Sequence, residues 1–520
     1  MRFFAALAVV CLCYACPAAH AEPVGPRLPP APLVPQQSID LSQFPRPQAL
    51  LPAVEFWTHV FSSYSEHQLL LHAQDFPHKV ITVLDYRDQA AAGVDPVKLR
   101  RQLLREERAA KKKIDGLLKA VHQKRADPAS MNAEERSLFD LFADLNDPLI
   151  YQKLIGRIRG QRGLKERTAL AITRAGAYMP EIERVFAERK LPLALTRLPI
   201  VESSFNVEAY SKVGAAGIWQ FIPSSARQYM VLDDLRDERS DPWTATYGAA
   251  RHLQADFDAL QSWPLAVTAY NYGRAGLSRA LKQVKGTTLV DLLERFESPR
   301  FGFASRNFYA EFLAAVDVER DALAHFGPLK SEPPLKFEQV QVADFVAYST
   351  VQELSGANLE HFQRLNPSWR SEVREDKLYL SPGASLRVPP GQAQAFQVAY
   401  AKLPAEQRHA RQREYWRSHK VRSGESLITI AKHYRIPLRD IQRANAIRNP
   451  HFIKIGQRLK IPPPADAMLS QARPRVHKVR SGQTLSQIAR DHRVSLEALV
   501  AHNDLDRGQL LHVGTRLQIP

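Results

Sequence analysis

An internal repeat limits what the C-terminal part of this chain can fold into. Residues 419–462 recur as residues 477–520 at a constant offset of 58 positions. Both copies begin with His-Lys-Val-Arg-Ser-Gly, end in Ile-Pro, and carry an asparagine at the matched positions Asn445 and Asn503. So many matches at one offset indicate two copies of the same small domain.

Each copy is expected to fold as strand, helix, helix, strand. Gly424 permits a tight turn, and the hydroxyls of Ser426 and Thr484 stand where helix caps are expected. The copies resemble LysM modules, which are small βααβ domains that bind N-acetylglucosamine-containing glycans. The resemblance implies that the glycan contacts come from Ser423, Gly424, Asn445, Ser481, Gly482 and Asn503. Two weak sites joined by the Pro-rich linker after Pro462 would gain avidity on a polymer.

A third, eroded copy precedes these two at residues 335–390. Leu365-Asn366-Pro367 and the stretch 382–389 echo the second half of the repeat. The first half lacks the Ser-Gly turn. We expect a LysM-like fold here, and the sequence leaves its glycan binding open.

The N-terminus is typical of an export signal spanning residues 1–21. Arg2 supplies the positive charge, an apolar core runs from Phe3 to Tyr14, and small residues precede a cleavage site after Ala21. All three cysteines lie within this segment, so cleavage would leave no disulfide, cysteine nucleophile or cysteine-bound metal. An alternative makes Cys16 a lipidated first residue. No later segment has the roughly 20 apolar residues of a spanning helix.

The net charge points to a polyanionic partner. The chain has 71 Lys and Arg against 54 Asp and Glu, a balance of +17. An exported protein with this charge meets the peptide carboxylates of the cell wall, and no nucleic-acid fold signature accompanies it. The charge therefore favours an anionic surface and not nucleic acid. The resemblance to LysM modules implies peptidoglycan strands as partner. With the export signal, we expect a periplasmic location, with peripheral or lipid-anchored association with the outer membrane as an option. Protein partners stay undefined.

Three regions precede the repeats. Residues 22–52 begin with a cluster of prolines and are expected to form an extended tether. Residues 53–190 show a helical pattern, as do residues 191–330, where Asp241-Pro242 is typical of a helix start. The sequence therefore predicts an all-helical domain at 191–330.

Glu202 is the candidate catalytic acid. Cleavage of a glycosidic bond needs an acid that holds its proton near neutral pH. Glu202 follows Leu195, Leu198, Ile200 and Val201. Burial among these side chains would raise the pKa of the carboxyl, as the reaction requires.

Residues after Glu202 could form a saccharide site around it. Gly214 and Gly217 frame a loop in which backbone can approach a ligand, and Gln220 follows with an amide that can bind a sugar. Trp219 and Phe221 line either the groove or the core. Further on, the Tyr270 hydroxyl could orient the glutamate, and Asn271 adds a second amide.

These motifs resemble those of lysozyme-like lytic transglycosylases. The resemblance rests on Glu202-Ser203, Gly217-Ile218-Trp219-Gln220, Ala269-Tyr270-Asn271 and the preceding Leu191-Pro192-Leu193. The resemblance implies a multidomain chain with a mostly α, lysozyme-like catalytic domain followed by small α+β modules. It implies cleavage of the β-1,4 bond between N-acetylmuramic acid and N-acetylglucosamine without water. Glu202 would act first as acid and then as base, and the product would be a 1,6-anhydro sugar. Ser203, Gln220, Tyr270 and Asn271 would bind substrate.

Two positions depart from the family pattern. Tyr272 stands where a small residue is usual, so it narrows the groove or turns away from it. The family's Glu-Thr-Arg before a tyrosine is here Ala304-Ser305-Arg306, with Tyr309 as the nearest match for a substrate contact.

Two alternatives stay open. One is a hydrolytic muramidase of the same fold, and the other is an inert wall-binding protein that acts through its LysM modules. The absence of an evident second acid in the motifs favours the route without water. No metal site is predicted, since His72 and His78 are more typical of packing or surface, and no cofactor is expected.

Overall fold

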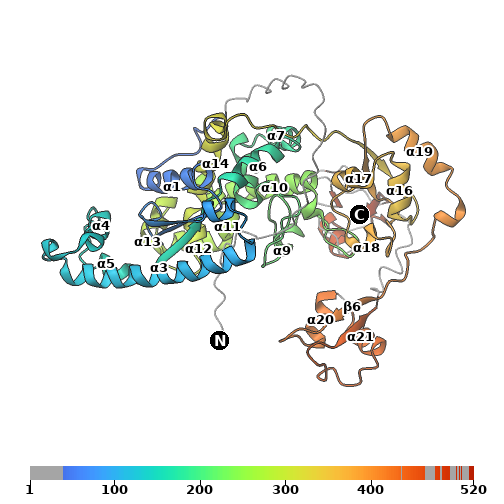
Figure 1. The fold of residues 1–520 in the computed structure, drawn as a ribbon. Helices are drawn as coiled ribbons and strands as arrows, with labels where there is room; N and C mark the ends of the chain where they lie inside the picture. Colours follow the sequence, from blue (N-terminus) through green and yellow to red (C-terminus); the bar gives the residue numbers. More distant parts are fainter. Residues whose placement is uncertain are drawn as a thin grey trace. The chain divides into compact units, whose positions relative to one another are not determined.

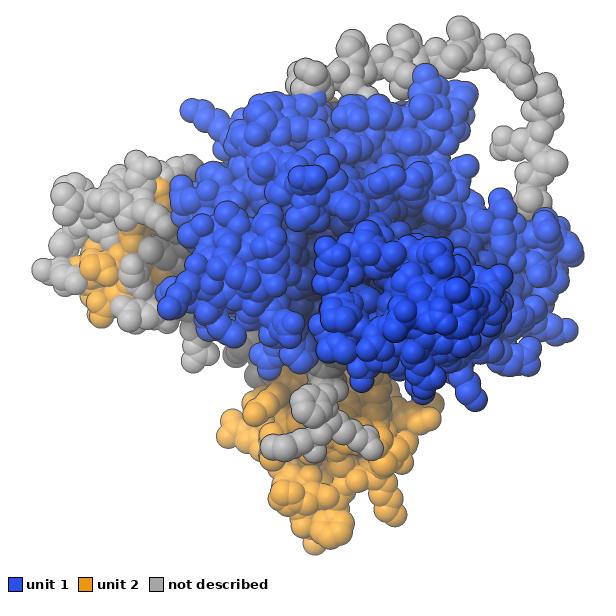
Figure 2. All heavy atoms as spheres, turned by 90° about the vertical axis from the view of Figure 1, so that its left-hand side faces the viewer, with its two compact units in different colours: residues 1–230, 239–335 blue, residues 231–238, 336–520 orange. Residues whose placement is uncertain are grey.

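The computed structural model describes residues 39–434, 436–462, 475–480, 483–491, 499–500, 503, 505 and 514–519. The predicted export signal, its cysteines and the first part of the predicted tether lie outside these residues. The chain divides into two compact units, Met1–Met230 with Arg239–Leu335, and Val231–Glu238 with Lys336–Pro520 (Figure 2). Within the described ranges, no helix is long and apolar enough to cross a membrane.

The first unit is mainly helical (Figure 1). Its α-helices are α1 (Leu51–Ser62), α2 (Arg87–Ala91), α3 (Pro96–Lys124), α4 (Ala133–Leu141), α5 (Ile150–Leu154), α6 (Lys165–Ala175), α7 (Met179–Glu188), α8 (Leu198–Ser203), α9 (Pro223–Ala226), α10 (Pro242–Leu260), α11 (Trp263–Tyr272), α12 (Arg274–Val284), α13 (Leu289–Arg295), α14 (Phe303–Arg320) and α15 (Ala322–Phe326). Short 3-10 helices are η1 (Gln48–Leu50), η2 (Pro128–Ser130), η3 (Leu193–Arg197) and η4 (Glu238–Ser240).

Helix α14 is the centre of this unit. Most of its side chains are buried, and α1, α8 and α11 all pack against it. The predicted start of α10 is confirmed, because the Asp241 carboxylate accepts hydrogen bonds from the backbone of Trp243 and Thr244 and Pro242 occupies the first turn. The prediction of a mostly helical domain at 191–330 agrees with this arrangement.

The helical pattern predicted for residues 53–190 is correct for most of the region but omits a sheet. They contain an antiparallel sheet of β1 (Gln68–Ala73), β2 (Val80–Asp85) and β3 (Ile158–Arg162), in the order β2-β1-β3. All six residues of β1 are buried, so its apolar run has no alternation. Periodicity cannot distinguish such a short apolar run from a buried helix.

The prediction that residues 22–52 form an extended tether is wrong for its last part, because residues 39–52 are packed within the first unit. Phe44 is 1% exposed and packs against Trp263 and Phe312. Both guanidinium Nη atoms of Arg46 donate to the Asp317 carboxylate, at 2.6 and 2.8 Å. This segment is therefore part of the folded domain.

Among the described residues of the second unit, the strands form three small sheets, each built from two antiparallel strands. The first module has β4 (Glu338–Gln341), α16 (Tyr348–Leu354), α17 (Leu359–Leu365), α18 (Ser371–Arg374) and β5 (Ser385–Val388), followed by α19 (Ala393–Ala401) and η5 (Ala405–Gln407). The second has β6 (Arg417–Lys420), α20 (Leu427–Tyr434), α21 (Leu438–Ala444) and β7 (Arg458–Ile461). In the third, β8 (Arg475–Lys478), α23 (Leu485–Asp491) and β9 (Arg516–Ile519) are described.

In each of the first two modules, an asparagine after the second helix joins that helix to the last strand through side-chain hydrogen bonds. The Asn445 side chain donates to the carbonyls of Ile441 and Lys460 and accepts from the Lys460 amide. Asn366 makes the same contacts with Phe362 and Arg387. This shared clamp and the shared strand order show that the eroded copy keeps the architecture of the repeat.

Candidate active site

Glu202 lies in the last turn of α8, just before the helix is broken. Ser204 and Phe205 both adopt left-handed backbone conformations, with φ of 52°. The residue as a whole is half-buried, and its carboxyl is enclosed by protein. Surrounding protein raises its pKa to about 8, mainly through burial and secondly through the charge of Glu311. The predicted elevation of this pKa is confirmed, and Glu202 is protonated at neutral pH.

Glu311 is a second acid beside Glu202 that the motifs did not indicate. It lies on α14, which packs against α8. Burial raises its pKa to about 8, although the charge of Arg159 opposes that rise. Arg159 comes from β3 and lies over the ring of Phe303, 4.2 Å from its centroid. The only sequence signal for Glu311 is one acidic residue within the apolar run of α14.

The loop of residues 214–221 depends on a glycine packed against backbone. A Cβ at Gly217, where φ is +74°, would lie 1.7 Å from the Arg239 carbonyl oxygen. Arg239 is 3% exposed, and its guanidinium donates to the carbonyls of Gly214 and Phe221. No motif pointed to Arg239, yet it holds both ends of the loop.

Ser203 and Gln220 connect this loop to its surroundings. The Ser203 hydroxyl donates to the Ile218 carbonyl at 2.9 Å and so ties α8 to the loop. The Gln220 amide donates to the carbonyls of Gly217 and Ala209, at 2.8 and 3.3 Å. Gln220 therefore directs its side-chain nitrogen into the protein.

Tyr270 and Asn271 lie at the end of α11. The Tyr270 hydroxyl donates to the Trp219 carbonyl at 2.8 Å, and burial together with the charge of Glu202 raises the pKa of the phenol. Asn271 is exposed, and its side-chain oxygen accepts from Ser305 at 2.7 Å. The structure thus brings Tyr270 to the loop and to Glu202, as predicted, whereas the contact of Asn271 is with Ser305, the residue that departs from the family pattern.

A buried polar cluster lies behind Tyr270. The His252 ring packs edge-on against Tyr270, 5.5 Å between centroids, and His252 lies 3.7 Å from Asp256. Asp256 is fully buried, and neither carboxyl oxygen accepts a hydrogen bond from the described residues. Its nearest cation is Arg274, at 3.4 Å. Burial raises the Asp256 pKa to about 7 and, with Arg274, lowers that of His252 to about 4.

Three other side chains considered for the groove pack against other parts of the first unit. Tyr309 is 1% exposed and donates its hydroxyl to the Pro45 carbonyl at 2.9 Å, so the structure does not bring it to Glu202. Trp219 is fully buried and stacks on Phe186, which makes it a core residue. Tyr272 packs edge-on against Phe301.

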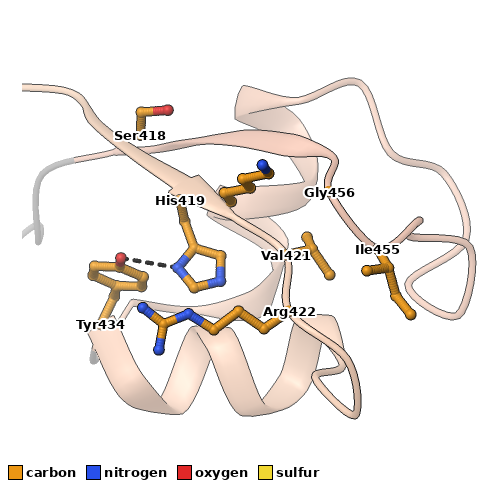
Figure 3. Close-up of a pocket in the computed structure, with 8 residues that line it drawn as sticks. Ser418, His419, Val421, Arg422, Tyr434, Ile455 and Gly456 are labelled. Atoms are coloured by element: carbon orange, nitrogen blue, oxygen red, sulfur yellow. Dashed lines mark hydrogen bonds between the residues drawn. The ribbon is translucent and has the colours of Figure 1, made fainter. Parts of the chain in front are cut away.

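A pocket on the second module is lined by Ser418, His419, Lys420, Val421, Arg422, Tyr434, Ile455 and Gly456 (Figure 3). His419 bridges Tyr434 and Glu425, at 3.0 and 2.9 Å. The predicted contacts Ser423 and Gly424 are exposed in the adjoining turn, where Gly424 has φ of +84°.

Asn445 serves as the clamp described above, and Asn503 donates to the Leu499 carbonyl. Both asparagines therefore have a structural role. Ser481 and Gly482 lie outside the described residues. Among the described residues, no group of His, Cys, Asp or Glu side chains could hold a metal ion.

Comparisons with known proteins agree with this organisation. Residues 183–289 match the family described as Transglycosylase SLT domain, and residues 419–462 and 477–520 each match LysM domain. Membrane-bound lytic murein transglycosylase D of Escherichia coli (strain K12) is 27% identical over 385 residues, covering 70% of this chain and 82% of that protein.

Two further likenesses are more limited. A putative tributyltin chloride resistance protein of Alteromonas sp. (strain M-1) is 32% identical over 126 residues, covering 24% of this chain and 60% of that protein. The solved lytic transglycosylase Slt of Pseudomonas aeruginosa is 17% identical, covers 40% of this chain and 33% of that chain, and has a TM-score of 0.25.

Proposed function

We propose that this chain, which carries a transglycosylase SLT domain and two LysM domains, is a peptidoglycan lytic transglycosylase with Glu202 as its acid and base. The observation that carries the assignment of Glu202 is its place at the end of α8, where burial raises the pKa of its carboxyl to about 8. Such a group holds a proton at neutral pH and can give it to a leaving oxygen.

The reaction we propose needs one carboxyl and no water. Protonated Glu202 donates its proton to the oxygen between N-acetylmuramic acid and N-acetylglucosamine, and the C1–O4 bond breaks. The N-acetyl group of the muramic residue stabilises C1. The C6 hydroxyl then attacks C1 and returns its proton to Glu202, which leaves a 1,6-anhydro end. Gln220, Tyr270 and Asn271 surround this step as proposed substrate contacts.

Glu311 gives the hydrolytic alternative a specific candidate, because a second carboxylate could activate water. Burial raises the Glu311 pKa to about 8, so this carboxyl is also largely protonated at neutral pH. A protonated carboxyl cannot remove a proton from water. This difference favours the anhydro route over hydrolysis.

We place the protein in the bacterial envelope, with its LysM domains on the wall. Support comes from the export-type N-terminus, the net charge of +17 and the 27% identity to a protein named as membrane-bound. The mass of the mature N-terminal peptide distinguishes two forms of the protein. One form is released by cleavage after Ala21, and the other is anchored by a lipid on Cys16.

The deciding experiment is digestion of purified peptidoglycan, followed by mass spectrometry of the released fragments. Anhydro ends, lighter than reducing ends by one water, support the proposal. Reducing ends would establish a muramidase, and no release would leave a wall-binding protein. Glu202→Gln should bind the wall and release nothing; full activity would remove Glu202 from the mechanism.

A further inference from the structure

The loop of residues 231–238 leaves the first unit and belongs to the second. Its backbone pairs with the first module of that unit: the Asp237 amide donates to the Ser368 carbonyl at 2.7 Å, and the Arg370 amide donates to the Leu235 carbonyl at 2.9 Å. Arg236 and Trp369 form an antiparallel bridge. The loop is thus bound as an added strand-like segment.

Side chains reinforce this contact. The Arg370 guanidinium donates to the Asp233 carbonyl at 2.7 Å and lies 3.6 Å from the Asp237 carboxylate. A further ion pair comes from outside this module, because Arg417 at the start of β6 pairs with Asp234 at 2.9 Å. Leu235 packs against the apolar core of the module. Backbone, charge and apolar contacts therefore all hold the same short loop.

The loop covers a turn that is open in the neighbouring LysM domain. In both modules this turn follows the clamp asparagine, Asn366 or Asn445. In the LysM domain the turn exposes Phe452 and Ile455, at 78% and 72%. In the LysM-like module it is covered, and Trp369 is 3% exposed.

The loop is directly continuous with the active site. It ends at Glu238, and the next residue is Arg239, which holds residues 214–221 through the carbonyls of Gly214 and Phe221. Gln220 lies on that segment. The position of the loop therefore bears on a residue that we assign to substrate binding.

We propose that the LysM-like module, residues 336–403, binds the protein's own loop 231–238 where the LysM domain is open to ligand, and so positions residues 214–221 of the active site. The module thereby serves as an internal dock and takes no glycan at this turn. The catalytic consequence rests on the proposed function, whereas the effect on residues 214–221 does not.

The test uses the full chain and breaks the contact from either side, with Arg370→Glu on the module and Leu235→Asp on the loop. Arg374→Glu is the matched control, because it makes the same charge change at an exposed arginine of α18. Hydrogen exchange of residues 214–221 is measured without substrate, and release of peptidoglycan fragments is measured in parallel. Wall binding serves to check that the LysM domains are intact.

Both variants should exchange faster at residues 214–221 and release fragments on the order of 10- to 100-fold more slowly, while wall binding and the control stay at wild-type values. Unchanged exchange in both variants would overturn the dock, whatever the release rate. Faster exchange with a wild-type release rate would overturn its role in positioning. If the wild type releases nothing, the proposed function fails, and exchange still decides the dock.

Discussion

The Tyr270 hydroxyl donates to the backbone carbonyl of Trp219 across 2.8 Å, and burial together with the charge of Glu202 raises the pKa of the same phenol. This hydrogen bond connects α11 to the segment that carries Gln220. It fixes the ring next to the proposed acid without involving Glu202 itself.

Tyr270→Phe should therefore impair catalysis more than stability. Loss of one hydrogen bond costs about 0.5–1.5 kcal/mol of unfolding free energy, whereas misplacement beside the acid should lower kcat on the order of 10-fold or more. The measurements are thermal unfolding and the rate of fragment release. Tyr272→Phe is the control, and equal effects of both changes would count against a positioning role.

Glu311→Gln should shift the pH dependence of the reaction. Donation requires protonated Glu202, so activity should persist below about pH 8 and fall as the pH rises through that value. The charge of Glu311 raises the pKa of Glu202, so its removal should move this alkaline limb to lower pH. Glu294→Gln, at an exposed position of α13, should leave the limb in place. An unmoved limb in Glu311→Gln would show that the two acids are not coupled.

Asp256→Asn should flatten the pH dependence of folding stability. The Asp256 pKa is about 7 in the fold against 3.8 for an ordinary aspartate, so the folded state keeps a proton that the unfolded chain loses. Wild-type stability should fall from this source as the pH rises from about 4 to about 7. The stability of Asp256→Asn relative to wild type should rise over the same window, as measured by denaturant unfolding. A constant difference would contradict the assigned pKa.

Phe44→Ala should destabilise the catalytic unit by about 3–5 kcal/mol, because it empties a fully enclosed aromatic site. Tyr309→Phe should cost about 1 kcal/mol through its bond to the Pro45 carbonyl and leave kcat unchanged. Unfolding curves and fragment release measure both effects. A loss of activity in Tyr309→Phe at unchanged stability would restore this residue to the substrate site.

The local properties of the site could be predicted from sequence, and its long-range contacts could not. The raised pKa of Glu202 was predicted from its apolar neighbours in the sequence, and burial is the largest cause of it in the structure. Glu311, Arg159 and Asp256 reach the site from α14, β3 and α10 through tertiary packing, which no motif spacing records. The strand β1 was missed for a related reason, since complete burial removes the alternation that marks a strand.

The structural role of two matched asparagines in the repeat could not be predicted from sequence. Asn445 and Asn503 are predicted glycan contacts, and in the structure their amides bind backbone groups. The predicted caps, in contrast, are confirmed, because the hydroxyls of Ser426 and Thr484 accept from the backbone of the following turn. Capping is local and has a sequence signature, whereas the clamp joins a helix to a distant strand.

The asparagine clamp at Asn366 and Asn445 separates two kinds of position within one small domain. The clamp and the apolar core determine whether the domain folds, and the turn after the clamp determines what it contacts. In the dock proposed here, a module that keeps the clamp accepts a peptide segment of its own chain at this turn. The same small fold can then serve as an internal part of the chain without a change in its strand order.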